Sequence, residues 1–298
     1  MQQAVWDHYR SFGLFTFPGK YQEDLQKNLP DDIREIGKLV RGSLVHRTSL
    51  IEGNQLENTD LRFGDMTRMP WYRQPEDDVL TTASAMLAEL YRRDPRGIVA
   101  DRAVENKLVV TCRYVAILMA SILKAKGIPA RVRAGHAPYF SFCHQMNISC
   151  DHWLNEYWHE KEKRWVIIDV DGSLSLAEDF DPYDMPAGKF DFPAPAWLGL
   201  RKQTIDPLRF WNAKPERGAL VLLWSFFYDF HCLMNQEILY IHGPLFGSSV
   251  QLANLLPEKL KKIDDLAILL CEPEKNFAAL KDIWENDKEF RILYGGLL

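Results

Sequence analysis

The sequence lacks the features that mark several specialised classes of protein. Its longest apolar stretch, residues 219–228, is too short to span a bilayer. The first residues have neither the basic start nor the apolar run of a signal peptide. There is no internal repeat and no low-complexity tract, and the net charge of −5 comes without a long basic stripe. These absences argue against membrane and nucleic-acid partners.

Cysteine is also scarce. The 298 residues include five cysteines and no Cys-x-x-Cys motif. An odd number of cysteines in a long chain is typical of free thiols in a reducing compartment, so we expect a cytoplasmic protein. Cys143 and Cys150 lie near His144 and His152, but their spacing matches no common structural zinc site. We therefore expect neither a metal ion nor another cofactor.

The most informative segment begins at Cys112. Thr111 is a suitable helix N-cap, and the apolar run that follows ends at Gly127 with Pro129 just beyond, which predicts a buried helix starting at the cysteine. A cysteine in the first turn of a helix faces unpaired backbone N–H groups and the positive end of the helix dipole. Both favour thiolate over thiol. The sequence therefore predicts an activated thiol at Cys112.

Three strand-like segments follow this helix, at residues 130–135, 151–158 and 164–171. Residues between the last two are charged and predict a hairpin turn. His152 begins one strand of the hairpin and Asp169 lies near the end of the other, so both lie at the same end of the hairpin. A thiolate, an imidazole that generates it and a carboxylate that orients the imidazole are what a thiol acyl-transfer site needs.

These residues resemble the transglutaminase-like superfamily of papain-like thiol enzymes, and the likeness is strongest over about residues 105–175, with uncharacterised bacterial proteins of similar length among its members. The matching elements are the helix start at Cys112, Gly-Ile-Pro-Ala-Arg after it, an Arg-x-Gly-x-x-x-Tyr-Phe stretch, Asp-His-Trp-x-x-Glu-Tyr-Trp, and Arg-Trp-Val leading to Asp169. The resemblance implies an α+β fold in which the cysteine helix packs on an antiparallel sheet, with extra N- and C-terminal helices. It also implies catalytic roles for Cys112 as nucleophile, His152 as general base and Asp169 as orienting acid.

The choice of carboxylate is open from the residues alone. Asp169 and Asp171 lie on one face of the predicted strand. If the hairpin turns through residues 160–163, Asp171 lies directly opposite His152 and Asp169 lies on the diagonal, about 7–8 Å away. The family resemblance favours Asp169.

The resemblance also bears on the activity. Arg113 stands where animal crosslinking enzymes carry tryptophan, so we expect a hydrolase, a peptidase or amidase acting on a peptide, protein or small amide, rather than a crosslinker. The order of Cys, His and Asp also resembles arylamine N-acetyltransferases, but their Arg-Gly-Gly lead-in to the cysteine is missing. A binding protein that keeps the fold without turnover is the other alternative. For the oxyanion, the Cys112 backbone N–H is the expected first donor, with Trp153 or Asn155 as candidates for the second.

We expect three regions in the chain: an N-terminal helical region at 1–100, the catalytic core at 101–180, and a wrapping segment with helices at 181–298 that forms one compact unit with the core. Apolar periodicity and the capping signals of Asp and Pro predict helices outside the core. Their expected ranges are 30–46, about 75–94, 218–240, 257–270 and 273–287. The long loop over residues 47–74 has a length typical of functional loops.

Overall fold

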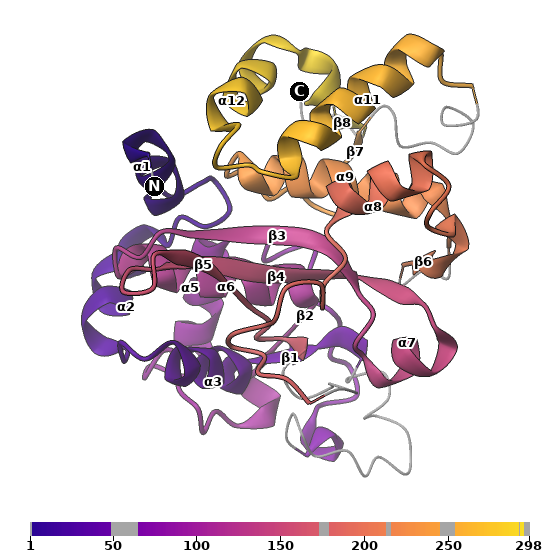
Figure 1. Ribbon diagram of the computed structural model, residues 1–298. Helices are drawn as coiled ribbons and strands as arrows, with labels where there is room; N and C mark the ends of the chain where they lie inside the picture. The colour runs from indigo at the N-terminus through magenta and orange to yellow at the C-terminus, as the bar shows by residue number, and fades with distance from the viewer. Residues whose placement is uncertain are drawn as a thin grey trace.

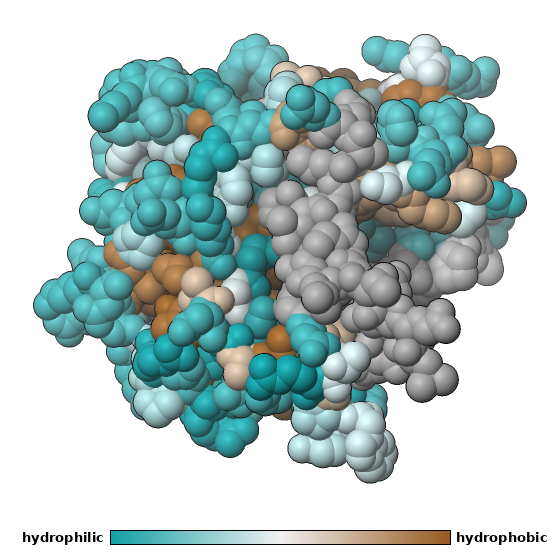
Figure 2. Space-filling model, turned by 90° about the horizontal axis from the view of Figure 1, so that it is seen from below, coloured by the Kyte–Doolittle hydropathy of each residue, from teal (hydrophilic) through white to brown (hydrophobic). Residues whose placement is uncertain are grey.

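The computed structural model describes residues 2–48, 65–172, 179–212, 216–244, 254–291 and 293–294. A central sheet separates two groups of helices (Figure 1). The helix that begins at Cys112 lies on one side of the sheet, and the C-terminal helices lie on the other. The α+β class with additional helices is therefore confirmed. Seen from below, the surface is mostly hydrophilic with smaller hydrophobic areas between (Figure 2).

The central sheet contains three antiparallel strands in the order β3 (Ala130–Ala137), β4 (Ser149–His159) and β5 (Arg164–Ile168), with β6 (Phe210–Trp211) parallel to the start of β4. Trp158 pairs with Trp165, so the hairpin turns through residues 160–163. However, β5 ends at Ile168, earlier than the expected 171. Asp169 and Asp171 therefore lie beyond the ladder, where the register of the hairpin no longer places them.

Helix α6 (Cys112–Ala125) begins at the cysteine, and all of its residues are buried. Gly127 ends it in the left-handed conformation, with φ of 76°, as glycine does at many helix C-termini. Thr111 occupies the N-cap position, but its hydroxyl donates to Asp77 Oδ1 at 3.3 Å instead of capping the helix. The helix is preceded by β2 (Leu108–Val110), which pairs in parallel with β1 (Leu44–His46).

Two N-terminal helices are shorter than the sequence pattern predicts. Helix α3 (Ile33–Ser43) is capped by the Asp32 side chain but gives way to β1, so the expected helix over 30–46 is wrong at its end. Helix α5 (Ala83–Arg93) begins after Thr82 rather than at Pro75. The acidic residues before Thr82 contact β2 instead of forming a first helical turn. Glu76 accepts a hydrogen bond from the Val109 N–H at 2.8 Å. Residues 49–64 of the expected loop lie outside the described residues.

The remaining elements complete the two layers of helices. Helix α9 (Ala219–Leu233) packs on β3 and is shorter than the expected 218–240, because Asn235 adopts a left-handed conformation that turns the chain. No helix among the described residues is long and apolar enough to cross a membrane. The other helices and strands are α1 (Gln3–Arg10), α2 (Gln22–Asn28), α7 (Ser141–Met146), α8 (Pro193–Arg201), α11 (Pro257–Leu270), α12 (Phe277–Asn286), β7 (Gly243–Pro244) and β8 (Leu293–Tyr294), with short 3₁₀ turns at Gly19–Tyr21, Met66–Arg68, Val104–Asn106, Pro207–Arg209 and Lys288–Phe290.

Each face of the sheet is held by a different kind of contact. The α6 side is an apolar core that includes Ile117, Leu118 and Ile122, each contributing about 1.5–3 kcal/mol by burial. On the other side, buried ion pairs join β3 to α9. Arg133 donates from Nε and Nη2 to the two oxygens of Asp229 at 2.7 and 2.8 Å. Such paired charges fix the position of α9 on the sheet, since either one alone would be costly to bury.

Candidate active site

Cys112 lies at the N-terminus of α6 with 6% of its surface exposed. Its Sγ lies 3.4 Å from the hydroxyl of Tyr240, and His152 and His46 are near enough to lower the pKa of the thiol through charge and hydrogen bonding. The sulfur is therefore surrounded by polar hydrogens contributed by β4, by β1 and by the segment after α9.

His152 reaches the sulfur from the middle strand of the sheet. It is 3% exposed, and its Nε2 lies 3.0 Å from both carboxylate oxygens of Asp169. The Nε2 proton is therefore directed at the carboxylate, which leaves Nδ1 for the thiol. The edge of the Phe140 ring packs against the imidazole, with centroids 4.9 Å apart. The structure thus brings together Cys112, His152 and Asp169, the three residues predicted from the sequence.

Asp169 is completely buried and receives hydrogen bonds besides that of His152. The Tyr139 hydroxyl donates to Oδ2 at 2.6 Å and the Gly172 backbone N–H donates to Oδ1 at 2.8 Å. A Cβ at position 172 would lie 2.1 Å from Asp169 Oδ2. Glycine is therefore required there for the backbone to approach the carboxylate this closely.

Asp171 is turned away from His152. One of its oxygens accepts a hydrogen bond from Arg41 at 2.8 Å, and the other lies 3.9 Å from His46 Nε2. The pairing of Asp171 with His152 that the extended hairpin register predicts does not form, because β5 ends before that register reaches it.

The charges at the site favour a thiolate beside an imidazolium. Burial raises the pKa of the Cys112 thiol, but the charge of His152 and hydrogen bonds from His152 and His46 outweigh burial, so the pKa is lowered. Burial lowers the pKa of His152, but Asp169 and Cys112 raise it well above its ordinary value. For Asp169, burial is offset by His152, Tyr139 and Gly172, so its pKa is lowered. The arrangement therefore supplies a nucleophilic sulfur and a stored proton next to it.

Comparison with known proteins is consistent with this geometry. Residues 74–170 match the family model of the transglutaminase-like superfamily. Residues 74–170 of the chain are therefore similar to a transglutaminase-like core. The resemblance seen in the sequence is thereby confirmed. No curated protein sequence matches the chain.

Among solved structures, one described as that of a "Putative Cysteine Protease from Cytophaga hutchinsonii" is 13% identical, with a TM-score of 0.36. The match covers 64% of this chain and 46% of that protein, so it spans less than half of the other protein's length.

His46 is a residue near Cys112 that the sequence did not predict. It lies opposite Val110 in the parallel pair of β1 and β2, which brings it to the start of α6. Burial lowers the pKa of His46, but Asp171 and Cys112 raise it by more than burial lowers it, so the net shift is upward. Its Nδ1 faces the Thr48 N–H at 3.3 Å. The only signal in the sequence is the apolar Leu-Val before His46, which matches the Leu-Val-Val before Thr111.

Of the two residues proposed as second oxyanion donors, Asn155 already donates its hydrogen bond to another group. Its Nδ2 donates to the Ala116 carbonyl in α6 at 2.9 Å. Trp153 packs against Tyr228 and Tyr240 with ring centroids 5.7 Å away in each case. Asn155 therefore joins β4 to α6, and Trp153 forms part of an aromatic cluster beside the sulfur.

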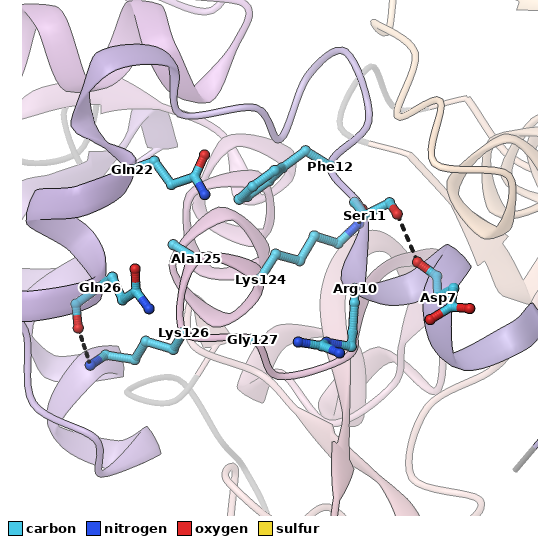
Figure 3. Close-up of a pocket in the computed structure, with 10 residues that line it drawn as sticks. All are labelled: Asp7, Arg10, Ser11, Phe12, Gln22, Gln26, Lys124, Ala125, Lys126 and Gly127. Carbon is cyan, nitrogen blue, oxygen red and sulfur yellow. Dashed lines mark hydrogen bonds between the residues drawn. The ribbon is translucent and has the colours of Figure 1, made fainter. Parts of the chain in front are cut away.

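Two cavities lie away from Cys112. One, of about 510 Å³, lies at the opposite end of α6, where Lys124 extends to the Ser11 carbonyl at 2.8 Å (Figure 3). The other, of about 220 Å³, lies on the far face of the sheet beside Arg131 and Glu156. Within the part of the chain that the structure describes, no group of three or more His, Cys, Asp or Glu side chains could hold a metal ion.

Proposed function

We propose that the protein is a thiol-dependent acyl-transfer enzyme acting on an amide or ester carbonyl. Cys112 acts as nucleophile, His152 as general base and then acid, and Asp169 orients the imidazole. The observation that carries the proposal is that His152 lies 3.0 Å from both oxygens of the buried Asp169 and is the group that most lowers the pKa of the Cys112 thiol at the start of α6.

The reaction follows from the protonation states at the site. The Cys112 thiolate attacks the carbonyl carbon, a C–S bond forms, and the carbonyl π electrons move to oxygen. Collapse of this oxyanion breaks the bond to the leaving group, which takes the proton held by His152. The imidazole then removes a proton from the acceptor, which attacks the thioester and releases Cys112. Asp169 stabilises the imidazolium at both stages.

We infer hydrolysis rather than protein crosslinking, with water as the acceptor and a peptide, protein or small amide as the substrate. The support is that Arg113, which stands in the position of the crosslinking enzymes' tryptophan, is fully buried and bonded to backbone carbonyls. All five cysteines are free, which is compatible with the cytoplasmic location proposed from the sequence.

Thioester trapping tests this proposal. Brief treatment with p-nitrophenyl acetate at pH 7, followed by peptide mass mapping, should place the acetyl group on Cys112 and release one p-nitrophenol per chain in a burst. Cys112→Ala should abolish the burst, and Cys271→Ala, which removes an exposed thiol, should leave it unchanged. Acetylation spread equally over exposed cysteines would instead support the alternative of a binding protein without turnover. Adding a primary amine then separates the acceptors, since a hydrolase continues to release acetate while an acyltransferase forms the amide.

A further inference from the structure

Tyr240 lies against the proposed nucleophile although it is far from it in sequence. Its hydroxyl is 3.4 Å from Cys112 Sγ, and the two residues are 128 positions apart. The contact is therefore created by the fold. Among the residues that the structure describes, no other tyrosine hydroxyl forms a hydrogen bond with this sulfur.

The Tyr240 ring is held by aromatic neighbours on two sides. Trp153 of β4 packs edge-on against it, with centroids 5.7 Å apart and an interplanar angle of 78°. Tyr228 of α9 is nearly perpendicular to it, with centroids 6.2 Å apart, and donates its hydroxyl to the Tyr240 backbone carbonyl at 3.4 Å. Edge-on aromatic packing of this kind fixes ring orientation. The hydroxyl is thereby presented to the sulfur in one direction.

The backbone before Tyr240 is held by the residue that follows the nucleophile. Arg113 is completely buried, and its Nε donates to the Ile238 carbonyl at 2.8 Å while Nη2 donates to the Glu237 carbonyl. Because the guanidinium is rigid and planar, two bonds fix the segment relative to the start of α6. The same turn of helix thus carries the sulfur and the group that holds Tyr240 in place.

We propose that Tyr240 is a catalytic residue whose hydroxyl is the second donor to the oxyanion, next to the Cys112 backbone N–H. The inference rests on the proposed function. The oxyanion forms two bonds away from Sγ, so a donor in contact with the sulfur is within reach of it. Burial and the neighbouring Cys112 charge raise the pKa of Tyr240 well above its ordinary value, so the hydroxyl keeps its proton to donate. Asn155 cannot take this role without giving up its bond to Ala116.

Two reactions of the same sulfur separate an oxyanion donor from other roles. Acylation by p-nitrophenyl acetate passes through an oxyanion, whereas alkylation by iodoacetamide does not. Tyr240→Phe should slow acylation about 100- to 1,000-fold, the usual loss for one oxyanion donor. Alkylation, measured at a pH where the thiol is fully ionised, should stay within about threefold because no donor to an oxyanion is needed. Tyr157→Phe is the matched control. It removes a hydroxyl from the face of β4 that also carries Trp153, and it should leave both rates unchanged.

The other outcomes overturn the assignment. An equal fall in both rates means that Tyr240 acts on the thiolate or on the fold alone, and a rise in both means that its hydroxyl blocks the sulfur. Unchanged rates mean that it has no role. A wild-type chain that alkylates at Cys112 but never forms the thioester would remove the proposed function and the role of Tyr240 together. If the wild-type chain does form the thioester but Tyr240→Phe does not selectively slow acylation, only the role proposed for Tyr240 is overturned.

Discussion

Two histidine–aspartate pairs lie near Cys112, one with its histidine on β4 and the other with its histidine on β1. They differ in the other groups that each carboxylate contacts. Asp169 presents both oxygens to His152 at 3.0 Å, and it also accepts hydrogen bonds from the uncharged Tyr139 hydroxyl and Gly172 N–H. Asp171 lies 3.9 Å from His46 and also pairs with Arg41 at 2.8 Å. The charge of Asp171 is therefore shared with a guanidinium, whereas that of Asp169 stabilises imidazolium. The two histidine–aspartate pairs are therefore expected to contribute unequally to catalysis at Cys112.

The largest contrast is expected from removing each imidazole in turn. His152→Ala should slow acylation of Cys112 by p-nitrophenyl acetate about 10³- to 10⁴-fold at pH 7, the upper range for general acid–base catalysis. His46→Ala should cost about tenfold or less, since His46 shares its aspartate with Arg41 and is 24% exposed in its side chain. Stopped-flow release of p-nitrophenol measures both rates.

Circular dichroism of the two histidine variants provides the control for folding. Equal losses from both substitutions would mean that the pairs act as one unit. A larger loss from His46→Ala would transfer the role of base to His46.

The two carboxylates should also differ, by a smaller amount. Asp169→Asn keeps the shape but removes the charge that stabilises the His152 imidazolium. Loss of the corresponding acid in a related mechanism costs about 10⁴-fold, and the good leaving group of the ester should reduce this to about 10²- to 10³-fold here. Asp171→Asn should stay within about threefold, because Arg41 already offsets its charge. The reverse ranking, at matched melting temperatures, would assign the orienting role to Asp171.

The parts of this site that could be predicted are those set by local sequence. Thr111, Gly127 and the apolar run between them predict α6 and its start at Cys112, and the residues of the 160–163 turn predict the register that pairs Trp158 with Trp165. The family resemblance then favoured Asp169 over Asp171.

What could not be predicted depends on contacts between distant segments. The end of β5 at Ile168 removes Asp171 from the ladder, and Arg41, 130 residues earlier, takes up its charge. His46 and Tyr240 come to the sulfur through a parallel strand pair and through a turn held by Arg113, and neither leaves a periodic pattern in the sequence. The same limit explains α5, whose expected first turn instead supplies acceptors to β2.

A substitution at Gly172 tests how closely Asp169 must be held. Gly172→Ala places a Cβ 2.1 Å from Asp169 Oδ2 and 2.8 Å from the Phe140 ring, so the carboxylate must move away from His152. We expect acylation to fall about tenfold, since the charge remains but its geometry is disturbed. Gly188→Ala, at an exposed glycine with open space around it, controls for added bulk although its φ of 84° carries some strain. An unchanged rate would show that Asp169 tolerates displacement.

The smallest expected effect, a shift of the pH profile, compares the two imidazoles as thiolate stabilisers. The pKa of Cys112 is lowered by His152 first and by His46 second, so its thiolate persists as pH falls. Half-maximal iodoacetamide labelling of Cys112 should therefore lie at lower pH than the value of about 8.5 for an ordinary thiol. His152→Ala removes the larger stabilising charge and should move the profile to higher pH, and His46→Ala should move it by less. Mass mapping distinguishes Cys112 from Cys143, whose pKa is lowered by a hydrogen bond with Cys150 at 2.8 Å. Cys271 is exposed at the surface, but partial desolvation and the neighbouring Glu272 raise its pKa, so it is the internal control and should label only at higher pH. A profile that neither substitution moves would show that the helix start alone ionises the sulfur, and the two histidine pairs would then differ only in proton transfer.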